Sequence, residues 1–264
     1  MIYDKTRYIA PYSYLINKDI QEYDIAKANI SILRDSGYLN EDQYKYFYNL
    51  PKQEREIKIG LLIRRDPKIN KILSNGFLNA RKIFFESNHI EDANVLYIDK
   101  DSVTLIDFPV TIHQISDHVD FKSKDTYTSF YRLNGIDFLY FNNNRKERYR
   151  FKNVNKDMIE MYHHEYMIDF LLSMAYMAQS ESILNVILSI KEFYKQYTSR
   201  SLPYGYYREF NNTSRFKALS SSGYNWYIEN IDYNMTIDDL DISYNANIIR
   251  YLYKIFMNEY FKTI

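Results

Sequence analysis

The stretch VLYIDKDSVTLI (Val95–Ile106) carries the strongest fold signal in the chain. Two apolar, β-branched blocks flank the acidic turn Asp99-Lys100-Asp101, which is typical of a β-hairpin with acids at its tip. Core packing does not account for the acids, because carboxylates are almost never buried without a partner. Two carboxylates presented side by side suit a hard divalent cation such as Mg²⁺, which prefers oxygen ligands. A solvated turn with two acids is the competing interpretation.

Length, charge and composition limit the classes of protein that the chain can belong to. Its 264 residues suffice for one large domain or two modest ones. Lys+Arg and Asp+Glu number 34 each, so any contact with nucleic acid must come from local patches. The absence of cysteine excludes disulfides and thiolate metal sites. No apolar run approaches the ~20 residues of a membrane span, and the start lacks a signal-peptide core. We expect no membrane partner and a cytoplasmic location, which for a viral protein is the host cytoplasm.

The spacing of apolar residues predicts a mixture of strands and helices. A short extended stretch around Tyr23–Ile25 passes into a helix that ends near Leu33. Two helical stretches split at Pro51 follow, and then a longer helix with one apolar face over residues 69–87. Residues 107–154 are mostly strand and turn, with a hairpin around the Asn-rich segment 142–144. Three amphipathic helices are expected beyond them, at Lys156–Gln179, Ser180–Tyr197 and Tyr244–Phe261.

Two of these segments resemble motifs of the family B DNA polymerases, a class of right-hand polymerases. YDIAKANISIL (residues 23–33), where one acid ends a short strand before a helix, resembles motif A, an Asp followed by a Ser-Leu-Tyr-Pro-Ser-Ile-like turn. VLYIDKDSVTLI resembles motif C, which reads Tyr-x-Asp-Thr-Asp-Ser between two strands. KILSNGF (residues 71–77) is similar to the first half of the Lys-x-x-x-Asn-Ser-x-Tyr-Gly fingers motif. The resemblance spans residues 22–107.

This resemblance implies a Mg²⁺-dependent site for nucleotide transfer. Asp24 and Asp101 would be catalytic and would bridge Mg²⁺, with Asp99 beside them as a weaker ligand. Lys71 would be the phosphate-binding cation, and Asn75 would contact the nucleotide. These roles come from the matched motif positions alone.

The expected fold class is α+β in two parts. Residues 1–155 would form a palm-like antiparallel sheet with packed helices, and residues 156–264 a mainly helical carboxyl-terminal region. These helices suit a thumb-like element or a dimerisation surface, and the sequence does not separate the two.

Three departures from the polymerase pattern support an alternative function. Ala28-Asn29-Ile30 stands where motif A offers a Tyr that screens the ribose, and Lys100 stands where motif C has Thr. The segment between the motifs is also much shorter than in a complete polymerase. These departures favour a non-catalytic, phage-type binding or assembly protein with a nucleic-acid partner, a protein partner or a second copy of itself. Retention of all three acids favours the enzyme.

Two stretches combine basic and aromatic residues, as single-strand binding requires. They are NRKERYRF (residues 144–151) and the stretch from Arg200 to Lys217. The chain has 29 Tyr, whose rings serve cores and interfaces equally well, and a codon bias toward AT would enrich them without any function. The candidate nucleic-acid-binding residues are Arg145, Lys146, Arg148, Tyr206, Tyr207, Arg208 and Arg215.

The histidines do not have the spacing of metal ligands. His163, His164 and Glu165 are adjacent, whereas ligands on one helical face stand three or four residues apart. His113 and His118 are five apart. We expect surface or partly buried histidines at these positions.

Overall fold

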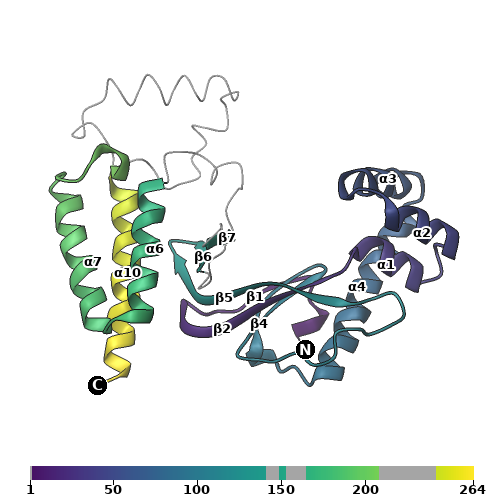
Figure 1. The fold of residues 1–264 in the computed structure, drawn as a ribbon, viewed down its shortest axis with the longest axis horizontal. Helices are drawn as coiled ribbons and strands as arrows, with labels where there is room; N and C mark the ends of the chain where they lie inside the picture. The colour runs from purple at the N-terminus through teal and green to yellow at the C-terminus, as the bar shows by residue number, and fades with distance from the viewer. Residues whose placement is uncertain (1, 141–148, 153–164, 208–241) are drawn as a thin grey trace. The chain divides into compact units, whose positions relative to one another are not determined.

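A computed structural model describes residues 2–140, 149–152, 165–207 and 242–264 (Figure 1). The fold class is α+β, as the sequence predicts: an antiparallel sheet of seven strands, in the order β1-β3-β4-β2-β5-β6-β7, with packed helices. The strands are β1 (Arg7–Ile9), β2 (Tyr14–Ile25), β3 (Val95–Asp99), β4 (Ser102–Ile106), β5 (Phe121–Leu133), β6 (Ile136–Tyr140) and β7 (Tyr149–Lys152). The α-helices are α1 (Ala28–Asp35), α2 (Glu41–Asn49), α3 (Lys52–Arg65), α4 (Lys68–Asn88), α6 (Glu165–Ser180), α7 (Ile183–Thr198) and α10 (Ser243–Lys262). Short 3₁₀ turns lie at η1 (Ile2–Asp4), η2 (Asp92–Asn94) and η4 (Tyr204–Tyr207).

The chain forms two compact units, and the long strands β2 and β5 contribute to both. The first unit comprises Met1–Tyr12 and Lys18–Tyr127, and the second Ser13–Asn17 and Thr128–Ile264. The units change over at Tyr127, earlier than the predicted boundary after residue 155. The reason is that strands β6 and β7 bury their apolar side chains in the same core as the carboxyl-terminal helices.

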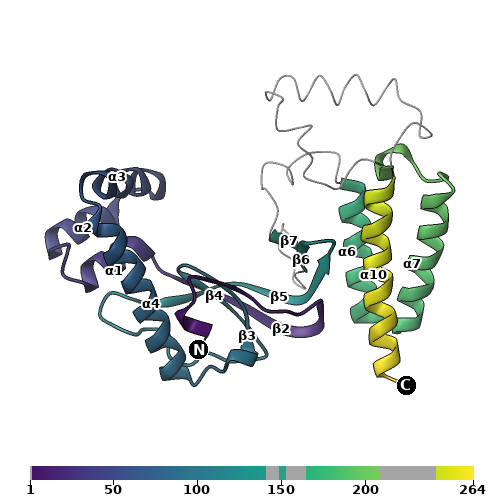
Figure 2. The same ribbon diagram turned by 180° about the vertical axis from the view of Figure 1, so that it is seen from behind.

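The first unit contains the predicted acidic hairpin, and helix α4 packs on it. Strands β3 and β4 pair in antiparallel register, and β4 pairs on its other side with β2 (Figure 2). Helix α4 repeats apolar residues every three to four positions, so one face is buried. On that face Phe84 stacks on Phe121 with ring centroids 4.0 Å apart. The hairpin, the strand-to-helix change near residue 25 and the helix break at Pro51 are all confirmed.

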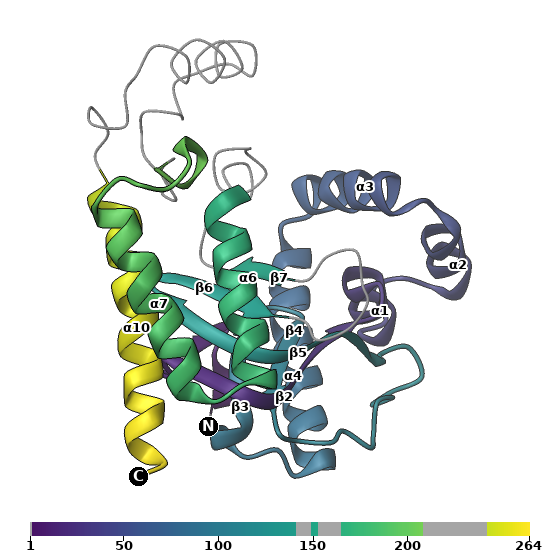
Figure 3. The same ribbon diagram turned by 60° about the vertical axis from the view of Figure 1, so that its left-hand side comes forward.

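The second unit has its own core, in which three helices lie side by side (Figure 3). Phe170 of α6 stacks on Phe193 of α7, with ring centroids 3.8 Å apart. Strands β6 and β7 pair as the predicted hairpin, although its turn lies outside the described residues. No helix in the described ranges is long and apolar enough to cross a membrane.

Helix α4 approaches α1 closely at a glycine, which generates a stability prediction. A Cβ on Gly76 would overlap Cγ2 of the buried Ile32. Gly76→Ala should therefore lower the free energy of unfolding by about 1–3 kcal/mol, because the two helices must move apart. Gly60 lies in α3, and a Cβ there would meet no atom within 4 Å, so Gly60→Ala should stabilise by about 0.5–1 kcal/mol. Urea unfolding of both variants measures the contrast, and equal effects would contradict this packing.

Candidate functional site

Sheet pairing brings Asp24 and Asp101 together. Asp24 stands at the end of β2 opposite Ser102, the first residue of β4. The backbone N–H of Ile25 donates to the carbonyl oxygen of Asp101 at 3.1 Å. The two acids therefore sit at neighbouring strand ends, which confirms the predicted convergence.

The turn that carries Asp101 is held in place from beneath by Arg81 of α4. Lys100 adopts a left-handed conformation, with φ at 48°, which non-glycine residues adopt only at a cost. Its N–H donates to the carbonyl of Thr6 at 3.0 Å, and its own carbonyl accepts from the Arg81 guanidinium. Arg81 is 1% exposed and donates also to the carbonyls of Tyr3 and Lys5. These contacts fix the backbone on which the Asp101 carboxylate depends.

A lysine on β5 forms ion pairs with both acids of β2. Lys124 Nζ lies 3.3 Å from Asp24 Oδ2 and 3.5 Å from Glu22 Oε1. Glu22 is 3% exposed, and the Tyr127 hydroxyl donates to its Oε2 at 2.8 Å. Glu22 and Asp24 share one face of β2 because side chains two apart in a strand point the same way. A carboxylate as buried as Glu22 needs these partners.

The carboxylates of Asp24 and Asp101 repel each other. Burial raises the pKa of the Asp101 carboxyl, and the negative charge of Asp24 raises it further. Oδ1 of Asp24 is buried and has no hydrogen-bond donor in the ionised pair. A proton on Asp101 can supply one, and this hydrogen bond is a further cause of the raised pKa. The pair therefore favours binding a positive charge, either as a proton or as a cation.

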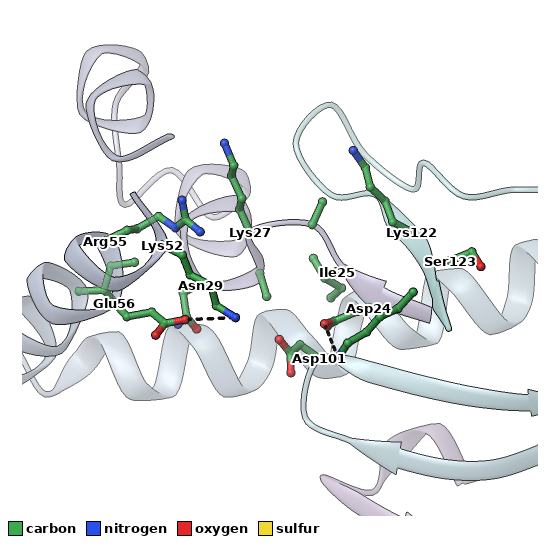
Figure 4. Close-up of a pocket in the computed structure, with 14 residues that line it drawn as sticks. Asp24, Ile25, Lys27, Asn29, Lys52, Arg55, Glu56, Asp101, Lys122 and Ser123 are labelled. Atoms are coloured by element: carbon green, nitrogen blue, oxygen red, sulfur yellow. Dashed lines mark hydrogen bonds and ion pairs between the residues drawn. The ribbon is translucent and has the colours of Figure 1, made fainter. Parts of the chain in front are cut away.

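An open pocket of about 430 Å³ lies over these carboxylates (Figure 4). In the close-up Asp24 and Asp101 lie next to each other, with the side chains of Lys27 and Arg55 on the helical side and Lys122 on β5. Basic side chains outnumber acidic ones around it. The charged residues that line the pocket are Asp24, Lys27, Lys52, Arg55, Glu56, Asp101, Lys122 and Lys124.

The other members of the predicted polymerase-like site do not join this pair. Asp99 is exposed at the end of β3, pairs across the sheet with Arg7 and does not line the pocket. Lys71 is exposed on α4 and lines neither this pocket nor a second one of about 410 Å³ between α1 and α4. Asn75 lines that second pocket, apart from the acids. Within the described ranges no three or more His, Asp or Glu side chains are arranged to hold a metal ion. Of the three expected carboxylates, those of Asp24 and Asp101 line this pocket.

The predicted nucleic-acid-binding residues are described only in part. Tyr207 is 1% exposed and stacks on Tyr197 with ring centroids 4.9 Å apart, which leaves no face for a base. Tyr206 is half-buried and packs against Tyr166 and Phe193. Both rings thus belong to the second core rather than to a stacking platform. The remaining candidates lie outside the described residues: Arg145, Lys146, Arg148, Arg208 and Arg215.

His113 and His118 have packing roles. His113 Nδ1 lies 3.0 Å from the carbonyl oxygen of Phe121, and its ring packs on Tyr23. The ring of His118 lies 5.1 Å from that of Tyr44. His163 and His164 lie outside the described residues.

Sequence reasoning missed the basic side chains around the acids. Lys122 and Lys124 alternate along β5, and Glu22 and Asp24 alternate along β2, so each pair shares a strand face. That alternation is a signal, but only the pairing of β2 with β5 shows that the two faces coincide. No sequence motif includes Lys52 or Arg55 of α3.

Comparison with known proteins identifies the family. The family model described as "Bacteriophage PBS1 gene 130 protein" matches residues 1–258. The chain belongs to this family, and the match supports the viral origin that the sequence suggested. A search of curated proteins finds no match.

The raised pKa of Asp101 predicts how stability depends on pH. Its folded-state pKa lies above the unfolded value of 3.8, so its contribution to stability is complete below that pH and is lost as the pH rises through the folded-state pKa. Asp101→Asn removes the repulsion and should raise Tm at pH 7 in EDTA by about 2–4 °C, equivalent to ~1 kcal/mol. The gain should vanish below pH 3.8.

Differential scanning calorimetry at pH 7 and pH 3.5 measures this effect. Asp99→Asn is the matched control, because it removes an equal charge from the exposed side of the same turn. A Tm for Asp101→Asn at or below that of the wild type at pH 7 would show that the acid pair is not strained.

Proposed function

We propose that this phage protein is a palm-like nucleic-acid-related protein that catalyses Mg²⁺-dependent nucleotidyl transfer at Asp24 and Asp101. The observation that carries the proposal is the convergence of two carboxylates from distant segments in one pocket that five basic side chains also line. Burial raises the pKa of the Asp101 carboxyl, and repulsion by the Asp24 carboxylate raises it further. Because the repulsion between the two carboxylates is unfavourable without a neighbouring positive charge, this arrangement suits a site that binds a cation.

The residues present fit a divalent cation. Oδ1 of Asp24 is a buried acceptor without a hydrogen-bond donor. A metal-ligating oxygen has this character before the ion binds. Carboxylate oxygens are the protein ligands that Mg²⁺ prefers, and one or two of them suffice when phosphates and waters complete the shell. Such an ion would supply charge neutralisation at the phosphate and activation of a hydroxyl group.

The protein side chains have separable tasks in this proposal. Asp101 must be ionised to hold a cation, so cation binding should strengthen as the pH rises through its raised pKa. Lys124 balances Glu22 and Asp24 beside the pair. Arg81 fixes the turn through the Lys100 carbonyl and so keeps Asp101 directed toward Asp24. In each case the element that holds the side chain is a strand end or a buried helix, which favours precise geometry.

The second candidate is a non-catalytic binding or assembly protein, and the contacts of Lys124 favour it. Its ammonium group already lies at salt-bridge distance from the Glu22 and Asp24 carboxylates. This positive charge offsets part of the repulsion without any metal, and the acid pair would then be structural. In this case the partner is a nucleic acid or a protein, and the oligomeric state is part of the function.

A primer-extension assay with labelled nucleotides separates the two candidates. Wild-type protein should transfer nucleotides with Mg²⁺ and not with EDTA, and Asp24→Asn or Asp101→Asn should lower the rate by about 10²-fold or more. Asp99→Asn should retain the rate, because Asp99 does not line the pocket.

Thermal melting checks that each variant is folded. Absence of transfer by the folded wild type, on primed DNA and primed RNA alike, would contradict the enzymatic proposal and leave the binding or assembly role.

A further inference from the structure

The acid pocket has a basic wall that the polymerase resemblance does not assign. Three of its residues belong to the helical side: Lys27, which precedes α1, and Lys52 and Arg55 in the first turn of α3. In Figure 4 they lie across the pocket from the β5 residue Lys122. Lys52 and Arg55 stand three apart in a helix and so project from neighbouring positions on its surface.

Contacts with the carboxyl-terminal end of α2 orient two of these cations. Lys27 Nζ donates to the carbonyl of Tyr48 at 2.8 Å and lies over that tyrosine ring. Arg55 Nη1 donates to the carbonyl of Leu50 at 3.2 Å, and its side chain is half-buried. A guanidinium group has five N–H donors, and this hydrogen bond uses one of them. Its remaining donors suit an external acceptor near the pocket.

The excess of positive charge in the pocket lies on its helical side. Five basic side chains and three carboxylates line the pocket, but Lys124 pairs with Asp24 and Glu22, and Lys122 lies 3.7 Å from Asp120. Lys27, Lys52 and Arg55 therefore face only Glu56 on their own side. Glu56 lies 3.9 Å from Lys52, too weak a surface pair to remove that charge from the wall. Acids beside one another and a basic wall facing them suit a ligand that brings both phosphates and a divalent cation.

We propose that Arg55 and Lys52, supported by Lys27, bind the phosphates of an oligophosphate ligand, in place of Lys71 and Asn75. The planar fork of Arg55 matches two phosphate oxygens at once, and Lys52 adds a point charge one turn away. A pocket of about 430 Å³ has the size of an ordinary small-molecule site. The identification of the ligand as a nucleoside triphosphate rests on the proposed function, whereas the phosphate site itself does not.

Tripolyphosphate binding measured by isothermal titration calorimetry tests the assignment without requiring catalysis. In low salt and EDTA, wild-type protein should bind it, and Arg55→Met or Lys52→Met should each weaken binding by about 10-fold or more. Arg55→Lys should give an intermediate loss, because the charge remains and the fork does not. Lys45→Met is the control, since Lys45 is an exposed α2 lysine outside the pocket lining.

Lys71→Met tests the competing assignment from the sequence motif. A loss of tripolyphosphate affinity in this variant with none in Arg55→Met would overturn the proposal, as would the absence of binding by wild-type protein. If binding depends on Arg55 but no nucleotide transfer occurs, the phosphate site stands and the enzymatic function fails. If transfer occurs and Arg55→Met has no effect on tripolyphosphate affinity, the enzymatic function stands and the phosphate site at Arg55 fails.

Discussion

The buried guanidinium of Arg81 is the interaction on which the geometry of the site depends. It joins three backbone carbonyls, from Tyr3, Lys5 and Lys100, and so ties the amino-terminal segment and the hairpin turn to helix α4. Hydrogen bonds from a charged donor are worth about 1.5–3 kcal/mol each, enough to hold Lys100 in its left-handed conformation. Burial lowers the pKa of Arg81, and the charges of Asp101 and Asp4 act in the opposite direction. The positive charge of Arg81 is therefore also attracted by Asp101, one of the candidate catalytic acids.

Electrostatic compensation then extends from this turn across the sheet. Asp101 and Asp24 repel each other, Lys124 pairs with Asp24 and Glu22, and the Tyr127 hydroxyl donates a hydrogen bond to Glu22. Such a network is costly where any member lacks a partner, and Asp24 Oδ1 is the oxygen that does. This unmet acceptor belongs to one of the two paired acids, which is why a cation held by the pair is central to the proposal.

Local patterns in the sequence were sufficient to predict the helices and strands, but they did not predict which distant strands pair with one another. Helix α4 follows from apolar periodicity, because it buries one face. The hairpin at Val95–Ile106 follows from two continuous apolar blocks around an acidic turn, because both of its strands are buried along nearly their whole length. The meeting of Asp24 with Asp101 follows from two strand-end acids and the motif resemblance. Lys124 could not be placed, because its strand pairs with β2 across about a hundred residues of sequence. Non-local pairing of this kind leaves no local trace.

The positions of the other candidate residues have equally physical causes. The resemblance of KILSNGF assigns Lys71 to phosphate binding and Asn75 to the nucleotide, and neither residue lines the pocket of the acids. Helix α4 turns its apolar stripe toward the sheet and leaves position 71 exposed. Tyr207 lies in a basic, aromatic stretch, yet burial in the second core is the more favourable place for its ring. Residue type and spacing therefore identified the carboxylates, whose chemistry is specific, better than the lysines and tyrosines, which serve many roles.

The most direct test of a cation site at the acid pair is an anomalous diffraction measurement on crystals soaked in Mn²⁺, a close substitute for Mg²⁺. The account predicts an anomalous peak within coordination distance, about 2.0–2.6 Å, of carboxylate oxygens of both Asp24 and Asp101. A saturating soak that leaves no peak at the pair, with Lys124 still bridging Glu22 and Asp24, would contradict it and show that the acids are a structural charge cluster.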